Sequence, residues 1–212
     1  MELSVLKIDG TESGKKVTLN ESVFGVEPNN HAIYLDVKQY LANQRQGTHK
    51  SKEKSEVAYS TKKIVRQKGS GGARHGSIKA NIFVGGGRVF GPRPRTYGFK
   101  LNKKLKQLAR FSALSYKAQE NVITIVEPFA MEVPKSKELL NILNNIKANS
   151  RKVLFVLPEN SNNIYLSSRN LENVKVINVN EINTYDIMCA YSIVFVDGTQ
   201  DTLKAEYHQQ IR

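Results

Sequence analysis

Residues 153–157 read VLFVL, a run of apolar residues rich in β-branched and aromatic side chains, and this run decides the fold. Similar short runs occur at 122–126 (VITIV), 174–178 (VKVIN) and 193–197 (IVFVD). A run without polar alternation is typical of a strand that is buried on both faces. Helical segments separate the runs, so the strands are expected to be parallel and joined by right-handed crossovers. The sequence therefore predicts an α/β fold, a three-layer α/β/α domain with a mainly parallel sheet of about four strands.

The other predicted elements surround this sheet. Residues 3–8 and 15–19 are expected to form a short hairpin, because the turn-rich DGTESG lies between them. Asn29 and Asn30 can cap a helix at 31–45, which Gly47 would end. Further helices are predicted at 102–119, 136–148, 164–170, 185–190 and 199–210.

A long basic insertion separates the first two long helices. From Gln44 to Lys106 the chain has 17 Lys and Arg against Glu53 and Glu56, a net charge of +15, while the remainder carries −2 of the total +13. Such segregation indicates a surface for a polyanion, either a nucleic acid or an anionic membrane. Apolar runs such as 153–157 have only five residues, far too few to cross a bilayer. We expect a globular domain of residues 1–45 and 100–212, and an extended loop of residues 46–99, the arm, which becomes ordered on RNA or DNA.

Glycines, cations and aromatic rings are interleaved along the arm. Cations cluster at 45–54 and 62–68, and glycines cluster at 69–77 and 85–95. Glycine lets the backbone approach phosphates closely, and Lys and Arg neutralise them. A flexible solvated linker, the alternative, seldom has this interleaving. Four rings are placed to stack on unpaired bases: Phe83, Phe90, Tyr97 and Phe99.

The helix at 102–119 is predicted to add a second basic surface. With about 100° per residue, four of its cations fall within a sector of about 60°. The acid-free stretch from Val57 to Lys117 favours contact with phosphates over a solvated charged face. The four cations are Lys103, Lys106, Arg110 and Lys117, and the residues expected on the opposite, packed side are Leu101, Leu105, Leu108, Ser112 and Ser115.

Residue patterns that would indicate an enzyme or a metal site are weak. No Walker sequence occurs, and no G-x-G-x-x-G follows a predicted strand. Acids at predicted strand ends are explained as turns or caps, the histidines lack metal-ligand spacing, and the single cysteine is expected to be a buried, inert thiol. No cofactor and no metal are therefore predicted. The acids are Glu127, Glu159 and Asp197, the histidines are His31, His49, His75 and His208, and the cysteine is Cys189.

Three stretches resemble a known family. They are RQKGSGGARHGSIK (66–79), GGGRVFGPRPRTYGFKLNKKLKQLARFSALS (85–115) and VEPFAMEVPKSKEL (126–139), and they resemble the universal large-subunit ribosomal protein conventionally numbered four. The resemblance implies a globular domain on the subunit exterior and a loop that threads into large-subunit rRNA, with its tip at the constriction of the nascent-peptide exit tunnel. It further implies a non-enzymatic protein of the cytoplasmic ribosome that acts early in assembly and has rRNA, other large-subunit proteins and the nascent peptide as partners, with no membrane. The end of the chain at Arg212, without the long extension of eukaryotic members, indicates a bacterial type.

The resemblance also assigns roles to residues. Lys68 and Arg74 are the tip cations expected to face the tunnel wall. Gly72 and His75 depart from many bacterial members, which have Arg and a small residue there, so a fixed charge is lost and a titratable ring is gained. His75 itself is either a stacking or phosphate-contacting residue or a solvent-facing one. The predicted tunnel tip is Gln67, Lys68, Gly69, Ser70, Gly71, Gly72, Ala73 and Arg74. The predicted rRNA contacts are Arg45, Lys50, Lys52, Lys62, Lys63, Arg66, Lys68, Arg74, His75, Lys79, Arg88, Arg93, Arg95, Lys100, Lys103, Lys104, Lys106 and Arg110.

Two alternatives stay open at this point. An α/β enzyme acting on nucleic acid would use the arm to grip its substrate, but it requires convergent acids or a cofactor loop. A free RNA chaperone or translational repressor would use the same arm without being part of a subunit.

Overall fold

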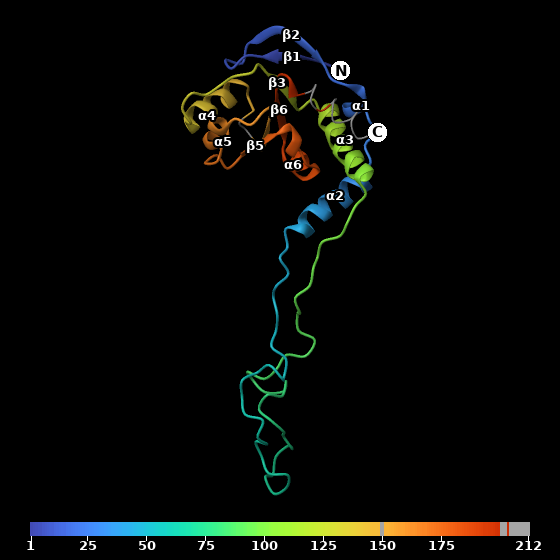
Figure 1. Cartoon of the computed structure of the whole chain (residues 1–212), viewed down its shortest axis with the longest axis vertical. Coiled ribbons are helices and arrows are strands. Elements are labelled where there is room, and N and C mark those ends of the chain that lie inside the picture. Colours follow the sequence, from blue (N-terminus) through green and yellow to red (C-terminus); the bar gives the residue numbers. More distant parts are fainter. Residues whose placement is uncertain (149–150, 200–202, 204–212) are drawn as a thin grey trace. The chain divides into compact units, whose positions relative to one another are not determined.

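The sheet of the globular domain has six strands, as seen in the computed structural model, which describes residues 1–148, 151–199 and 203 (Figure 1). Their order is β2-β1-β3-β6-β4-β5, and only the β1–β2 pair is antiparallel. The strands are β1 (Glu2–Leu6), β2 (Glu12–Thr18), β3 (Ile123–Val126), β4 (Val153–Leu157), β5 (Val174–Asn178) and β6 (Ser192–Val196). The predicted α/β fold with a mainly parallel sheet is confirmed.

The hairpin differs from its prediction because it joins the sheet. Val5 of β1 pairs in parallel with Ile125 of β3, and Leu6 pairs with Val126. Val5 is fully buried, so the pairing hides an apolar side chain that a separate hairpin would leave in water. The sheet therefore contains β1 and β2 in addition to the four predicted parallel strands, and both lie on the β3 side.

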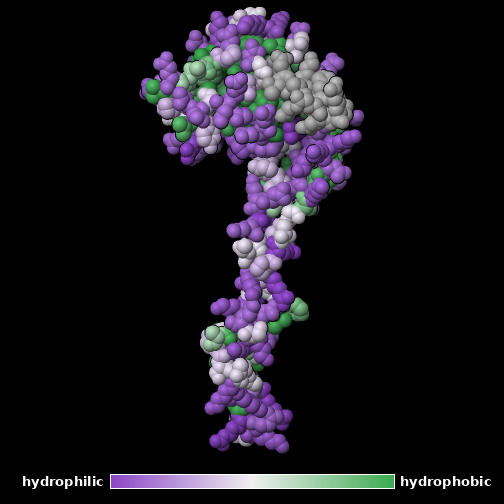
Figure 2. Space-filling view, viewed as in Figure 1, coloured by the Kyte–Doolittle hydropathy of each residue, from purple (hydrophilic) through white to green (hydrophobic). Residues whose placement is uncertain are grey.

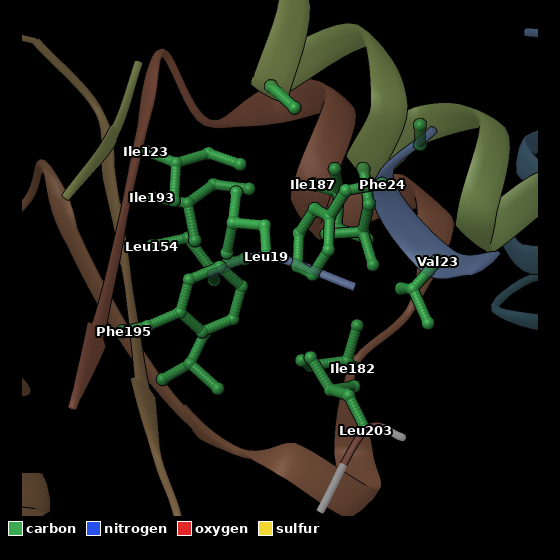
Figure 3. Packing of buried hydrophobic residues seen from close by; sticks show 14 of the residues in the cluster. Leu19, Val23, Phe24, Ile123, Leu154, Ile182, Ile187, Ile193, Phe195 and Leu203 are labelled. Carbon is green, nitrogen blue, oxygen red and sulfur yellow. The ribbon is translucent and has the colours of Figure 1, made fainter. Parts of the chain in front are cut away.

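Both faces of the sheet are buried, which explains the uninterrupted apolar runs. On β6, Ile193 and Phe195 belong to one hydrophobic cluster, and Val194 and Val196 belong to the other. Figure 3 shows the first cluster, where Phe24 meets Phe195 edge-on with ring centroids 6.2 Å apart. The second cluster packs α4 and α5 against the other face. The sheet is therefore the middle layer of three.

The helices lie close to their predicted positions. They are α1 (Glu21–Phe24), α2 (Asn30–Asn43), α3 (Lys103–Gln119), α4 (Ser136–Asn145), α5 (Asn162–Ser168) and α6 (Thr184–Cys189), with a 3-10 turn at Val179–Glu181. The side chain of Asn29 accepts a hydrogen bond from the Ala32 amide at 3.0 Å, as expected of a cap for α2. The short α1 was not predicted, because four residues are too few for a periodic pattern. Most of the helix expected at 199–210 lies outside the described residues, although Thr199 and Leu203 are both buried.

The prediction of a buried thiol at Cys189 is wrong. Cys189 is exposed at the last position of α6, whose buried residues are Thr184, Asp186 and Ile187. Its apolar neighbours Met188 and Tyr191 are also exposed. This end of α6 faces solvent, so the apolar residues next to Cys189 in the sequence do not enclose its thiol.

The structure divides into two compact units, Met1–Tyr40 with Lys100–Arg212, and Leu41–Phe99. The second unit contains the arm, where strand-like pairing is limited to one isolated bridge between Lys63 and Ser77. Within residues 46–99, all of which are described, only Val57 and Gly87 are buried. The arm therefore has almost no core of its own.

Candidate nucleic-acid interface

The two limbs of the arm are folded back on each other and joined at intervals by backbone hydrogen bonds (Figure 1). Each bond joins a residue of the outgoing limb to one of the return limb, so the limbs run antiparallel and the chain reverses near residue 70. The donor and acceptor pairs are Arg95 to Gly47 at 3.1 Å, Ser51 to Pro92 at 3.0 Å, Arg88 to Lys52 at 2.9 Å and Ile64 to Gly76 at 3.1 Å. This spacing holds the limbs together without the continuous ladder of a sheet.

A tyrosine between two arginines closes the base of the arm. The guanidinium carbons of Arg45 and Arg95 lie 3.6 Å and 4.4 Å from the centroid of the Tyr97 ring. The Tyr97 hydroxyl lies 3.2 Å from Nε2 of His49. Gly47 is needed beside this cluster, because its φ is +68° and a Cβ there would lie 2.1 Å from the Arg95 carbonyl oxygen. Cation–π contacts with the ring therefore orient both guanidinium groups.

The cluster around Tyr97 was missed from the sequence. Arg45 and Tyr97 are 52 positions apart, so no local spacing relates them. The only signal in the sequence was that Tyr97 lies among cations, and this pattern was interpreted as that of a base-stacking ring. The structure instead places this ring in contact with Arg45 and Arg95.

The two acids of the arm are each matched to one cation. Lys50 bonds to the carboxylate of Glu56, and Arg93 bonds to that of Glu53. The pKa of Glu56 is lowered, first by the hydrogen bond from Lys50 and then by that from the Glu53 amide. Each carboxylate is therefore already bonded to a cation, and no other arm cation forms a salt bridge with an acid of the arm.

Most of the predicted rRNA contacts are exposed side chains. The exposed residues are Arg45, Lys50, Lys52, Lys62, Lys63, Arg66, Lys68, Arg74, Arg88, Arg93, Arg95, Lys100, Lys103 and Lys104. The half-buried ones are His75, Lys79, Lys106 and Arg110. Exposure makes these groups available to a polyanion, and their contact with RNA stays a prediction.

The basic face predicted for the helix after the arm is shorter than expected. Lys117 of α3 is only 8% exposed and forms an ion pair with Glu120 at 3.2 Å, so it does not belong to a phosphate-facing surface. Buried residues of α3 run from Ala109 to Ala118 and lie all around the helix. Other elements enclose this half of α3, which leaves only its first turns for cations.

The tip of the arm is open and rich in glycine. Gly69 and Gly71 have φ values of +82° and +68°, so the chain reverses through conformations that L side chains rarely adopt. A Cβ added at Gly69, Gly71 or Gly72 would have no atom within 4 Å. The side chains of Lys68 and Arg74 therefore dominate the shape and charge of this tip.

His75 packs within the arm and does not face solvent freely. Its ring meets Phe83 edge-on with centroids 5.2 Å apart, and its Nδ1 is buried without a hydrogen-bond partner. Phe83 is thus occupied in the same contact. Of the four rings predicted to stack on bases, Phe90 is the one that is fully exposed, with a relative exposure of 104%.

Among the described residues no three His, Cys, Asp or Glu side chains gather in a way that could hold a metal ion. Asp197 accepts a hydrogen bond from the Gly198 amide at 3.0 Å, which is the turn predicted for it. No helix within the described ranges has the length and apolar character needed to cross a membrane.

Residues 17–206 of the chain match the family described as the ribosomal protein L4/L1 family. The chain belongs to this family. A relative from Parabacteroides distasonis, named large ribosomal subunit protein uL4, is 61% identical over 199 residues, which cover 94% of this chain and 95% of that protein. Proteins of the same name from Phocaeicola vulgatus and Cytophaga hutchinsonii are 59% and 57% identical over 205 residues, with 97% of this chain covered and 97% and 99% of theirs. The L4 resemblance of the three motifs and its bacterial type are confirmed.

Proposed function

We propose that this protein is a structural constituent of the large ribosomal subunit and that its arm binds large-subunit rRNA. The observation that carries the proposal is the arrangement of charge on the arm. Its exposed cations follow two paired, extended limbs, and its only two acids are already matched by Lys50 and Arg93. Membership in a family of ribosomal proteins supports the same conclusion.

The physical role of the arm follows from its lack of a core. A segment with high net charge and few buried side chains repels itself in isolation, so it gains order when phosphates neutralise it. Glycines allow the two limbs to approach each other closely, and this keeps the arm thin. A thin arm can insert between RNA helices. Binding by the arm would therefore link protein order to rRNA folding, as expected of a protein that supports early subunit assembly.

The tip of the arm is proposed to line the nascent-peptide exit tunnel. This assignment rests on the resemblance of residues 66–79 to the family and on the open geometry of the tip. Lys68 and Arg74 would present the fixed charge there, beside the glycines that add no bulk. The partners are then rRNA, neighbouring large-subunit proteins and the nascent peptide, all on the cytoplasmic ribosome.

We propose no enzymatic function for this protein. Asp197 at the end of β6 forms a turn with Gly198, and the family is one of ribosomal proteins. The protein is therefore proposed to act by binding alone, without a cofactor.

Co-sedimentation with ribosomal particles tests this proposal. The full chain is expected to stay with large subunits through a wash in high salt, because an enclosed arm is shielded from exchange with the solvent. A protein that the wash removes completely would instead be a free RNA chaperone or translational repressor. A variant that lacks residues 50–95 serves as the control and should be lost from the subunit under the same wash.

A further inference from the structure

Phe90 lies in an unusual place for a phenylalanine. Its side chain is fully exposed, and its backbone φ is +53°, in the left-handed region that bulky L residues rarely adopt. Neither burial nor local backbone preference accounts for a large apolar ring here. Residues held in such a conformation persist where the surrounding structure enforces it, and they gather at binding sites.

The surrounding backbone enforces this conformation by pairing limbs of unequal length. The adjacent residues Ser51 and Lys52 bond to Pro92 and Arg88, which are four positions apart. The Ser51 amide donates to Pro92 at 3.0 Å, and the Arg88 amide donates to Lys52 at 2.9 Å. Residues 89–91, which lie between these two bonds, have no partners on the outgoing limb. They form a bulge with Phe90 at its centre.

Two glycines fix the ends of the bulge. A Cβ at Gly87 would lie 2.3 Å from the backbone nitrogen of Lys54, and a Cβ at Gly91 would lie 2.6 Å from the Ser51 side chain. Only glycine allows the return limb to come this close to the outgoing one on both sides of Phe90. The bulge is thus clamped at both ends, and the ring is pushed outward.

Cations surround the exposed ring. Phe90 lines an open hollow of about 760 Å³ with Lys54, Arg88, Arg93 and Arg95. The one acid of this hollow, Glu53, is bonded to Arg93. Figure 2 shows how small the apolar areas are on the mostly hydrophilic arm. An apolar ring flanked by cations matches a nucleotide, which has a flat base and an anionic phosphate.

We propose that the bulge at Val89–Gly91 is a stacking site for one unpaired RNA base, with Phe90 as the platform and Arg88 and Lys54 on the adjacent phosphates. This inference rests on the proposed rRNA-binding function and adds to it a specific ligand and residue. Stacking accepts any base, so the site recognises an unpaired nucleotide and not a sequence. It also supplies affinity that does not depend on salt, in contrast to the arm cations.

The test measures binding of the full chain to a deproteinised large-subunit rRNA transcript. Phe90→Ala is expected to weaken binding by about 5- to 150-fold, the range found when a base-stacking ring is removed. Phe90→Leu should weaken it similarly, because a leucine is apolar but has no face for a base, whereas Phe90→Trp should bind as well as the parent. Val84→Ala is the matched control, since Val84 is an equally exposed apolar residue of the arm at 104%, and its affinity should be unchanged.

A spectroscopic signal gives a second measurement. The chain has no tryptophan, so Phe90→Trp creates a single reporter whose fluorescence a stacked base should quench on rRNA binding. Val84→Trp provides the comparison, and its quenching should be much weaker. Equal quenching at both positions would overturn the proposal, because it would report general enclosure by RNA.

The outcomes separate this inference from the broader function. If the parent chain binds the transcript but Phe90→Ala binds equally well, the stacking site is wrong and rRNA binding by the arm stands. If Phe90→Leu binds rRNA like the parent while Phe90→Ala loses only incorporation into subunits, the ring contacts an apolar protein surface and the proposal is again overturned. If the parent chain does not bind the transcript at all, the proposed function itself fails.

Discussion

Deleting residues 50–95 should remove most of the salt dependence of rRNA binding. This segment contains 12 Lys and Arg, of which Lys50 and Arg93 are matched by the two arm acids, so ten cations are left for phosphates. Each phosphate contact contributes about 0.7 to 0.9 to the slope of log affinity against log salt. If all ten cations make contact, the arm accounts for a slope of about −7 to −9.

The expected effect is large enough to measure directly. With that slope, the contribution of residues 50–95 to the affinity falls by about 10⁴- to 10⁵-fold between 50 and 200 mM salt. The deletion variant should show a flatter line, because the six predicted contacts that remain are fewer than the ten cations removed. They are Arg45, Lys100, Lys103, Lys104, Lys106 and Arg110. Titration of the large-subunit rRNA transcript with each protein at several salt concentrations gives both slopes. A deletion variant with an unchanged slope would show that the globular domain is the main RNA-binding surface and would refute the reasoning.

A substitution variant separates charge from the loss of the chain itself. Replacement of four arm cations by glutamine keeps the arm and should lower the magnitude of the slope by about 3. The matched control replaces four exposed lysines of the globular domain and should leave the slope nearly unchanged. The arm set is Lys62, Lys63, Arg66 and Lys68, and the control set is Lys7, Lys15, Lys16 and Lys137.

Three further predictions concern the free protein and the assembled subunit. Hydrogen exchange on the free protein should be fast across residues 46–99 and slow in the sheet, because the arm has almost no buried side chains; protection of the arm equal to that of the strands would contradict this. Lys68→Glu should leave subunit yield nearly normal but change macrolide sensitivity or nascent-chain stalling, whereas a collapse of assembly would make Lys68 an anchoring residue. Phe195→Ala should lower the free energy of unfolding by about 3–5 kcal/mol in urea denaturation, because the ring is fully buried against Phe24, while the exposed Phe90→Ala should change it by less than about 0.5 kcal/mol.

Much of the fold could be predicted because its signals are local. The runs at 153–157 and 193–197 are apolar at every position apart from the final aspartate, and only a strand buried on both faces requires this. The alternation with helices then leaves a parallel sheet as the consistent arrangement. The interleaving of glycine and cations at 66–95 likewise indicated a segment for a polyanion, because neither residue type can build a core there.

The candidate site could be predicted only in its composition. The sequence identified the cations of the arm, but it did not show that Glu53 and Glu56 each occupy one of them, since opposite charges pair only where the folded chain brings them together. It treated Phe90 and Tyr97 as equivalent rings. Tyr97 is held between two arginines, and Phe90 is projected into solvent.

Sequence alone determined the fold class, the family and the place where positive charge is concentrated, because each depends on residue types and their spacing along the chain. Tertiary structure decided which of those residues are exposed and free to contact a ligand. Lys117 was predicted to share an exposed face of its helix with other cations, but it is buried in the folded protein. Cys189 was predicted to be buried because its sequence neighbours are apolar, but it is exposed. Tertiary structure also produced the bulge at Phe90, because hydrogen bonds join the adjacent residues Ser51 and Lys52 to Pro92 and Arg88, which are four positions apart. Contacts between residues distant in the chain determine exposure and pairing, and no local pattern encodes them.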